Sequence, residues 1–251
     1  MCQSSSPTAI TLTGASIGGG ATTAVWSITS GGGSLSSNAQ TANPSGITYT
    51  PAANYSGSVL LTLTTNAPSA CSVVSATRTI TVQQAPTVNA GGPDTVCQSS
   101  TPSAITLTGA SVGGGATAAW SITSGGGSLS STAQTANPSS VNYTPAANYF
   151  GPVVLTLTSN AASSCSVVSA TRTITVQQEP TVNAGALLTA CQSDTPSAIT
   201  LTGASVGGGA TAAWSITSGG GSLSSTAQTA NPESVTYTPA ANYSGTVVLK
   251  L

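Results

Sequence analysis

The stretch Ala118-Ala119-Trp120-Ser121-Ile122-Thr123 is the best guide to the fold, because a close copy of it occurs in each of three successive repeats. Its tryptophan recurs at intervals of 94 residues, as Trp26, Trp120 and Trp214. Tryptophan is the largest apolar side chain in each repeat, and burying it contributes strongly to a core. We therefore expect these three residues to be core anchors, one in each unit.

Apolar and polar residues alternate along this stretch and along several others, which is typical of half-buried strands. Strands at this density, bounded by Gly, Pro and Asn and without a helical period, predict an antiparallel β-sandwich and an all-β chain. The predicted inward-facing residues of the second repeat are Ile105, Leu107, Trp120, Ile122, Val141, Tyr143, Val153, Leu155, Leu157, Ile174 and Val176.

Two further features of the strand pattern need an interpretation. The glycine triplets at 113–115 and 125–127 lack the Gly-Lys-Ser/Thr ending of a phosphate loop, so we interpret them as turns. Arg172 lies two residues before the inward-facing Ile174, so the alternation of the strand would point it inward as well. We expect it to reach out at the end of the sandwich, or a β-bulge to turn it outward.

Proline marks the joints between the repeats. Pro86 and Pro180 each follow an apolar alternation, and proline cannot donate to a β-ladder. This predicts three units, at 1–84, 85–178 and 179–251. Compared with the second unit, the first is expected to lack its opening strand and the third its last strand and second cysteine, as in a segment of a longer array. A 94-residue repeat is too long for a solenoid, so the units should be separate domains in a row.

The composition excludes several classes of partner. Only 3% of the 251 residues are charged and the net charge is −1, so the chain has no field that would attract nucleic acid or anionic lipid. No run of about 18 apolar residues is present, so we expect no membrane insertion in this segment. The chain also shows no signal peptide after its first methionine.

The five cysteines fall into two kinds by their place in the repeat. Cys2, Cys97 and Cys191 are the early cysteines, and Cys71 and Cys165 are the late ones. Pairing within each unit predicts the disulfides Cys2–Cys71 and Cys97–Cys165, with Cys191 left unpaired. Such pairing indicates an oxidising, extracellular compartment, and closing a loop of roughly 70 residues would contribute about 4 kcal/mol. Buried free thiols are the alternative.

Candidate chemistry is sparse. The chain has no histidine, and none of its four acids, Asp94, Glu179, Asp194 and Glu233, recurs in another repeat. A paired-carboxylate mechanism, an activated serine, a calcium site and a zinc site each need residues that this pattern does not supply. We therefore predict no catalytic residue, no metal site and no cofactor, and we expect the chain not to be an enzyme.

The tyrosines and the threonines form two candidate ligand-binding surfaces. Tyr143 and Tyr149 flank Pro145, where we expect a core or corner tyrosine, with a sugar-binding platform as the alternative. The Thr-x-Thr strands would suit ice only if they formed a flat array, and the twist of a sandwich works against that.

Several motifs occur in a fixed order in the second repeat. They are Asn89-Ala90-Gly91, Asp94-Thr95-Val96-Cys97, Ile105-Thr106-Leu107, Trp120, Tyr143-Thr144-Pro145, Gly151, the strand ending at Thr158, and Cys165. Together they resemble the Ig-like or PKD-like tandem repeats of very large surface proteins in Bacteroidetes, including gliding-motility adhesins. The resemblance covers the whole chain and implies a secreted, cell-surface, adhesive or filament-forming protein, without a ligand-binding residue to carry over.

Two consequences of the resemblance concern covalent chemistry. Asp94-Thr95-Val96 is similar to the short O-glycosylation signal of Bacteroidetes, which makes Thr95 a candidate glycosylation site. Unlike in antibody domains, the first cysteine precedes the first strong strand. The disulfide could therefore tie the end of the sandwich, or bridge the sheets behind Trp120; the sequence leaves both open.

The resulting hypothesis is a structural repeat segment of a large secreted adhesin or extracellular filament. It would act as a stalk or spacer, with a further copy of itself as a candidate partner. The alternatives are a carbohydrate-binding adhesive module, whose partner would be a surface polysaccharide, and an ice-binding repeat.

Overall fold

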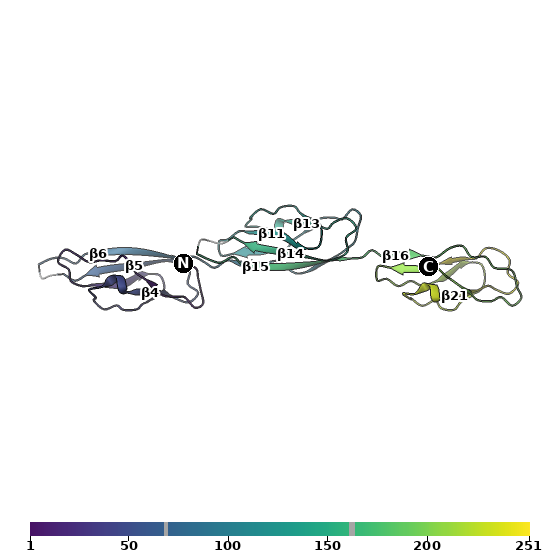
Figure 1. Ribbon diagram of the computed structural model, residues 1–251, viewed down its shortest axis with the longest axis horizontal. Coiled ribbons are helices and arrows are strands. Elements are labelled where there is room, and N and C mark those ends of the chain that lie inside the picture. Colours follow the sequence, from purple (N-terminus) through teal and green to yellow (C-terminus); the bar gives the residue numbers. More distant parts are fainter. Residues whose placement is uncertain (68–69, 161–163) are drawn as a thin grey trace.

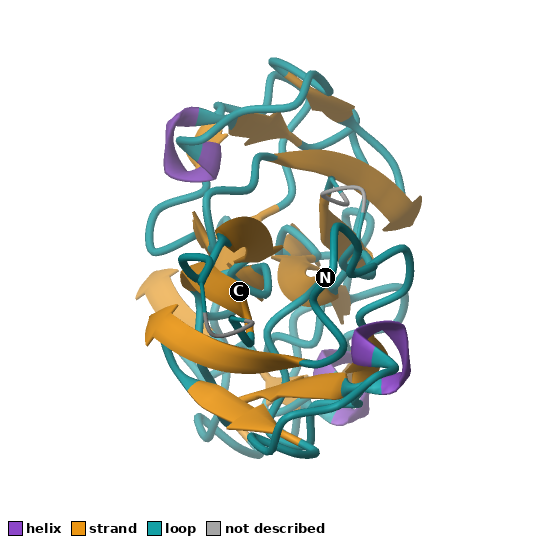
Figure 2. Ribbon diagram, turned by 90° about the vertical axis from the view of Figure 1, so that its left-hand side faces the viewer, coloured by secondary structure: helices purple, strands orange, loops and turns teal. Residues whose placement is uncertain are grey.

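The computed structural model describes residues 1–67, 70–160 and 164–251. The three units lie in a row along the longest axis of the molecule (Figure 1), and each has its own hydrophobic cluster. A view along that axis shows that the middle unit is displaced from the line of the other two (Figure 2). The described residues form strands and three short 3-10 turns, η1 (Pro44–Gly46), η2 (Pro138–Ser140) and η3 (Pro232–Ser234).

The second unit has the most extensive sheets. One sheet has the strand order β11-β14-β15-β8, with β8 parallel to β15, and the other has the order β12-β13-β9. A short pair, β10 and β7, accompanies them. The bounds are β7 (Thr87–Asn89), β8 (Asp94–Cys97), β9 (Ile105–Thr106), β10 (Ser111–Gly113), β11 (Ala118–Ser124), β12 (Ser128–Leu129), β13 (Asn142–Thr144), β14 (Gly151–Ser159) and β15 (Ser169–Gln177).

The register of the long strands follows from their alternation. Successive side chains of a strand point to opposite faces, so one parity of β14 faces the core and the other faces solvent. Val153, Leu155 and Leu157 of β14 are fully buried, and Ile174 lies opposite Val153 on β15. The outward positions are largely threonine, which is β-branched and suits a strand without adding charge.

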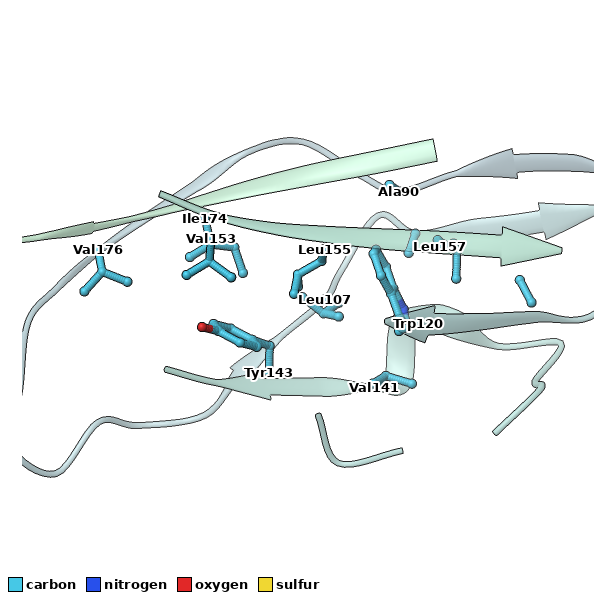
Figure 3. Close-up of a cluster of buried hydrophobic side chains, with 12 residues drawn as sticks. Ala90, Leu107, Trp120, Val141, Tyr143, Val153, Leu155, Leu157, Ile174 and Val176 are labelled. Carbon is cyan, nitrogen blue, oxygen red and sulfur yellow. The ribbon is translucent and has the colours of Figure 1, made fainter. Parts of the chain in front are cut away.

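The core of the second unit contains the predicted inward-facing residues (Figure 3). Nine of them are buried, and Ile105 and Ile122 pack against the cluster while partly exposed. Three small residues complete the cluster, and the alternation did not mark them: Ala90, Ala110 and Ala118. Alanine carries little apolar area, so it gives a weak signal in a sequence although close packing requires it.

Each tryptophan anchor is held by a polar contact as well as by packing. Trp26, Trp120 and Trp214 are 4%, 2% and 3% exposed. Each indole Nε1–H donates a hydrogen bond of 3.0 Å to the carbonyl of the proline that begins the 3-10 turn of its unit. A buried indole N–H without an acceptor would be costly. The short turns η1, η2 and η3 therefore fix the tryptophans in one orientation.

The first unit repeats this arrangement, with sheets β2-β5-β6 and β1-β4-β3. Its strands are β1 (Ile10–Thr11), β2 (Ala24–Ser30), β3 (Gly33–Leu35), β4 (Thr48–Pro51), β5 (Gly57–Thr65) and β6 (Ser75–Val82). The third unit has sheets β17-β21-β20, β16-β18 and β19-β22, and its strands are β16 (Thr181–Asn183), β17 (Ile199–Thr200), β18 (Ser205–Gly207), β19 (Ser215–Ser218), β20 (Ser222–Leu223), β21 (Thr236–Thr238) and β22 (Val248–Lys250).

The core of the third unit is open on one side. Its described strands include no counterpart of β15, so β22 pairs with β19 alone. A cavity of about 640 Å³ lies where β15 closes the second unit, and Trp214, Tyr237 and Leu249 line it. The apolar side chains of the neighbouring segment are correspondingly exposed, with Leu187 at 92%.

Candidate functional site: the joint between the first and second units

The early cysteine lies at the end of its unit from which the chain leaves. Cys2 forms a parallel bridge with Gln83, next to the last strand of the first unit. The backbone N–H of Gln3 donates to Gln83 at 2.7 Å, and that of Gln83 donates to Met1 at 2.7 Å. These bonds place Cys2 directly beside the linker that leads to the second unit.

The late cysteine lies at the opposite end of its unit. Cys165 is in the connection between β14 and β15, which is at the end of the second unit that faces the first (Figure 1). The base of this connection is held by backbone hydrogen bonds from Ser159 to Val168 at 2.9 Å and from Asn160 to Thr117 at 2.8 Å.

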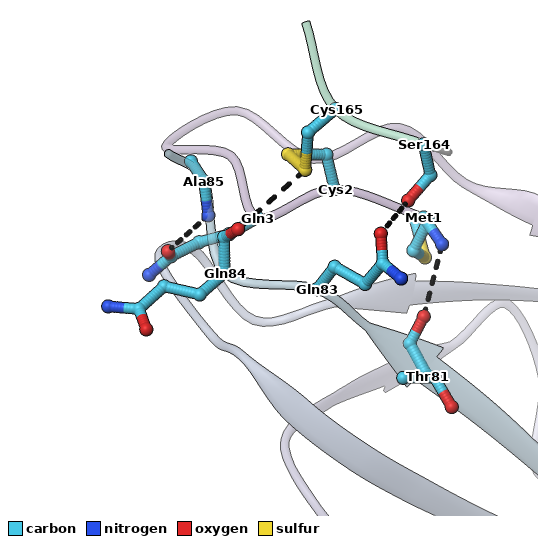
Figure 4. Close-up of a disulfide and its surroundings, with 9 residues drawn as sticks. All are labelled: Met1, Cys2, Gln3, Thr81, Gln83, Gln84, Ala85, Ser164 and Cys165. Atoms are coloured by element: carbon cyan, nitrogen blue, oxygen red, sulfur yellow. Dashed lines mark hydrogen bonds between the residues drawn. A yellow bond between two sulfur atoms is a disulfide. The ribbon is translucent and has the colours of Figure 1, made fainter. Parts of the chain in front are cut away.

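The disulfide joins two units rather than two strands of one unit. Cys2 is bonded to Cys165 with their Cα atoms 5.0 Å apart, across a sequence separation of 163 residues (Figure 4). Cys71, Cys97 and Cys191 are exposed free thiols. The predicted pairs Cys2–Cys71 and Cys97–Cys165 are therefore wrong.

The physical reason is the length of the sandwich. Within one unit the last strand, the nine-residue β15, separates the late cysteine from the early one. Nine residues of strand span roughly 30 Å, whereas bonded cysteines have Cα atoms about 4.4–6.8 Å apart. The two cysteines of one unit thus cannot reach each other, but the early cysteine of one unit meets the late cysteine of the next.

Polar contacts support the linker around the bond. The Ser164 hydroxyl donates to the side-chain oxygen of Gln83 at 2.8 Å, and the backbone N–H of Ala85 donates to the side-chain oxygen of Gln3 at 3.2 Å (Figure 4). Gly114, the middle glycine of a predicted turn, has φ of +75° and packs against the backbone of Ala85, so closely that a Cβ there would overlap its carbonyl. This glycine therefore serves the joint as well as the turn.

The second joint has the same supports without the disulfide. Cys97 lies opposite Gln177 on β15, and the backbone N–H of Glu179 donates to the side-chain oxygen of Gln98 at 3.0 Å. Gly208 packs against the Glu179 carbonyl, as Gly114 packs against Ala85. Cys97 is thus presented as Cys2 is, but no late cysteine faces it among the described residues of the third unit.

An asparagine in each unit fixes the early cysteine, and it was not recognised from the sequence. Asn54, Asn148 and Asn242 have φ of 57–58°, a left-handed conformation that asparagine tolerates better than most residues. The carbonyl of Asn148 accepts from the Gln98 side chain at 2.6 Å, and its N–H donates to Ser99 at 2.8 Å. Its occurrence in each Pro-x-x-Asn-Tyr motif was the available signal.

Arg172 has a different environment from the one predicted. The β14–β15 register runs without a bulge from Gly151 to Thr158, and Arg172 is buried at 4% exposure. Its guanidinium forms an ion pair with Asp94 of β8 and donates to the Thr108 carbonyl at 2.8 Å. The expectation that it reaches out at the sandwich end was wrong, because a carboxylate on the neighbouring strand pairs with the buried charge.

Three other residues were predicted as candidates for modification or ligand binding: Thr95, Tyr143 and Tyr149. Thr95 is exposed on β8, and its modification is untested. Tyr143 is fully buried and donates its hydroxyl to the Gly126 carbonyl. Tyr149 packs against the core and donates its hydroxyl to the Pro152 carbonyl, three residues further along the chain, at 2.8 Å.

Burial also changes the acidity of the core tyrosines. The pKa of Tyr143 is raised above its ordinary value of 10.0, mainly because burial disfavours the phenolate and further because Tyr149 is near. The pKa values of Tyr49 and Tyr237 are raised for the same reasons, with Tyr55 and Tyr243 as the neighbours. These groups are structural hydrogen-bond donors at neutral pH.

The described part of the chain contains no cluster of three or more His, Cys, Asp or Glu side chains that could hold a metal ion. No helix among the described residues is long and apolar enough to cross a membrane. The candidate functional site of the described residues is the covalent joint formed by Cys2 and Cys165.

Comparison with known proteins identifies the fold. No protein family and no curated protein matches the chain in sequence. Its structure is similar to the I-band fragment I67–I69 from titin, with a TM-score of 0.52 and 12% identity over 97% of this chain and 85% of that chain. Drosophila OTK extracellular domains 3–5 give a TM-score of 0.38 and 8% identity, over 99% and 91%. The chain is an all-β array of tandem Ig-like β-sandwich domains.

Proposed function

We propose that the chain is a structural segment of an extracellular protein, in which Ig-like units in a row form a stalk whose joints are closed covalently. The observation that carries the proposal is the Cys2–Cys165 bond between successive units. Disulfides persist in oxidising compartments, which supports an extracellular location. The near-identity of the units suits a spacer, because repetition supplies length and not a unique pocket.

The position of the bond suggests how such a stalk resists tension. A pull on the two chain ends passes from Cys2 through the disulfide to Cys165. The segment between these two cysteines, which contains most of the first and second units, then lies outside the path of the force. Unfolding that closed segment releases no length, so the first sandwich and the part of the second that precedes β15 bear no load, whereas β15 (Ser169–Gln177) lies in the path of the force.

The bond also spans more than one repeat. Its separation of 163 residues exceeds the 94-residue repeat, so in any array that keeps this pairing successive bonds overlap along the backbone. Every backbone position would then be bypassed by at least one disulfide. Such an array would be nearly inextensible, as a stalk or filament on a cell surface requires.

Single-molecule stretching of the full chain between its two ends tests this function. In the oxidised chain the final extension excludes the segment closed by the bond, and reduction adds about 550 Å of contour length for 163 residues. The variant Cys2→Ser/Cys165→Ser should give the long extension without reductant, and Cys71→Ser should behave like the unmodified chain. Equal final extension of the oxidised and reduced chains would show that tension runs through the units and would contradict the proposal.

We place the stalk on a bacterial cell surface, as part of a large adhesin of the Bacteroidetes type. The ordered motifs from Asn89-Ala90-Gly91 to Cys165 support this assignment. A surface polysaccharide would then be bound by individual units or by other parts of a longer protein. Binding of purified polysaccharides by the oxidised chain would favour the first arrangement.

A further inference from the structure

A glutamine follows the early cysteine of the first unit and contacts three segments at the joint. The side-chain amide of Gln3 donates to the Asn54 carbonyl at 2.6 Å, and its side-chain oxygen accepts from the Ala85 N–H at 3.2 Å. Its backbone N–H donates to the Gln83 carbonyl at 2.7 Å. Gln3 therefore connects a loop of its own unit, the residue after β6 and the linker to the second unit.

The second joint has the same set of contacts around Gln98. Its side-chain amide donates to the Asn148 carbonyl at 2.6 Å, and its side-chain oxygen accepts from the Glu179 N–H at 3.0 Å. Its backbone N–H donates to the Gln177 carbonyl at 2.7 Å. The linker contributes only a backbone N–H, so alanine in one joint and glutamate in the other serve equally well. The second joint is formed without a disulfide among the described residues, so these contacts do not depend on a covalent bond.

The second unit holds the same linker residue from its other side. Gly114 has φ of +75°, and a Cβ built on it would lie 2.3 Å from the Ala85 carbonyl oxygen. Ala85 is thus held at its N–H by the first unit and at its carbonyl by the second. Pro86 follows, and its ring fixes φ at about −65°. The direction in which the second unit leaves the first is therefore set by backbone contacts.

Both cysteines of the joint lie next to the residues that are held in this way. Cys2 precedes Gln3 in the chain, and the Cys165 sulfur is 3.7 Å from the Gln84 carbonyl oxygen. A disulfide requires Cα atoms about 4.4–6.8 Å apart, and the 5.0 Å found here lies within that narrow range. A linker free to change direction would carry Cys165 out of this range, because Cys165 belongs to the second unit.

We propose that Gln3 is the residue that positions the first two units for bonding. Its side chain fixes the linker, so that Cys165 is brought to Cys2 before the disulfide forms, and the disulfide then secures an orientation that is already set. Gln98 fixes the second joint in the same way without a bond. The inference rests on the same Cys2–Cys165 bond as the stalk proposal and adds what makes these two cysteines partners.

The equilibrium between the chain and glutathione measures this positioning. The thiolate of one cysteine attacks glutathione disulfide and releases one glutathione thiolate, and the second cysteine then displaces the other. Two protein thiols lose two electrons and two protons, and one glutathione disulfide becomes two glutathione molecules. The equilibrium constant has the dimension of a concentration, and it expresses the effective concentration of one cysteine at the other.

The test is a titration of the full chain with mixtures of reduced and oxidised glutathione. The substitutions Cys71→Ser, Cys97→Ser and Cys191→Ser lie at exposed positions and leave Cys2 and Cys165 as the only thiol pair. Loss of the fold should not obscure the result, because exposed substitutions of this kind have small effects on stability.

In this background the two glutamines form a matched pair of variants. Gln3→Ala should lower the effective concentration of the cysteine pair about fivefold to tenfold, which is the factor expected when about one net hydrogen bond is lost. Gln98→Ala removes the same contacts from the second joint and should leave the effective concentration unchanged.

Two neighbouring glycines test the contact from the second unit. Gly114→Ala and Gly115→Ala both place a side chain at a positive φ, of +75° and +66°. Only the first of these side chains would meet the Ala85 carbonyl, because nothing lies within 4 Å of a Cβ at Gly115. We expect Gly114→Ala to lower the effective concentration and Gly115→Ala to change it much less.

The opposite results overturn the inference. Equal effective concentrations with and without the Gln3 side chain would do so, as would an equal fall in Gln98→Ala or equal falls in the two glycine variants. Hydrogen exchange of the reduced chains separates positioning from folding. Protection of the first core around Leu61 should be the same in Gln3→Ala as in its parent, and a matching loss of protection would mean that Gln3 acts only by stabilising its unit.

The stalk proposal is judged separately in the same titration. If the parent chain forms the Cys2–Cys165 bond and Gln3→Ala changes nothing, the positioning role fails and the stalk proposal stands. If the parent chain forms no such bond, the basis of both proposals is refuted.

Discussion

The second and third units have nearly the same sequence over the 61 residues that both contain after their early cysteines, and they have different structures. Residues 97–157 and 191–251 differ at six of 61 positions, yet the second unit has a closed core and the third an open one. The second unit is also bonded to its predecessor, and the third is not. One strand, β15, and the connection before it account for both differences.

This comparison shows that the last strand has three roles. It covers the core with Ile174 and Val176, it pairs with β8 beside the early cysteine, and it follows the late cysteine in the chain. The third unit has no described counterpart of β8 at its own early cysteine, because no strand lies beside that segment. Closing a unit and linking it to its neighbour are thus achieved by the same segment.

The largest expected effect is the difference in covalent linkage between the two joints: the first and second units are joined by a disulfide, and the second and third are not. One digestion with trypsin reveals it. Trypsin can cut after Arg78, Arg172 and Lys250, which separates Cys2 from Cys165 but leaves each predicted intra-unit pair within one peptide. After blocking of free thiols and denaturation, peptides 1–78 and 79–172 should remain linked while 173–250 is released. Mass spectrometry without reductant measures the mass of the linked peptides directly. A peptide 1–78 that is not linked to 79–172 would support pairing within each unit instead.

The next effect concerns the closed and open cores. Leu155→Ala removes a fully buried side chain of the second unit and should cost about 2–5 kcal/mol of unfolding free energy. Leu249→Ala, at the corresponding partly exposed position of the third unit, should cost clearly less. Urea unfolding followed by hydrogen exchange of peptides from each unit makes the measurement. Leu61→Ala in the first unit should match Leu155→Ala, and equal costs for Leu155 and Leu249 would mean that the third core is closed in solution.

A smaller effect is expected at the ion pair of Asp94 and Arg172 in the second unit, which has no counterpart among the described residues of the other two units. Asp94→Ala leaves the buried Arg172 guanidinium without its carboxylate and should destabilise the second unit by about 1–3 kcal/mol. The third unit has Leu188 at the corresponding position, so its own stability should not change. Glu179→Ala, at an exposed acid two residues beyond the end of β15, serves as the control in the same unfolding assay. A loss no greater than that of Glu179→Ala would show that the pair contributes nothing.

The smallest effect is one that the two units should share. Because the pKa of Tyr143 is raised in the folded state above 10.0, its contribution to stability is fully present below about pH 10 and is lost as the pH rises further. Tyr237 has the same shift and the same hydroxyl bond to a glycine carbonyl, so both units should weaken together. Unfolding temperatures from about pH 8 to pH 11 test this in Cys2→Ser/Cys165→Ser, which removes disulfide exchange. Tyr143→Phe should make the second unit less sensitive to pH, and unchanged sensitivity would point to another group.

The sequence by itself determined the repeat, the strands and the core. Alternation along residues 151–159 and the recurrence of tryptophan were enough, because the two-residue period of a strand is a local property. It also identified which residue types could react, since cysteine is the only reactive side chain that recurs at a fixed place in each repeat.

Only the tertiary structure decided which cysteines meet. The repeat pattern suggested pairing within a unit, but the length of β15 holds the two cysteines of a unit at opposite ends. The partner of Arg172 was hidden for a related reason, because Asp94 is 78 residues away in sequence and reaches it through the parallel pairing of β8 with β15. Distances across a folded domain depend on how strands are placed side by side, and no local pattern in the chain records that.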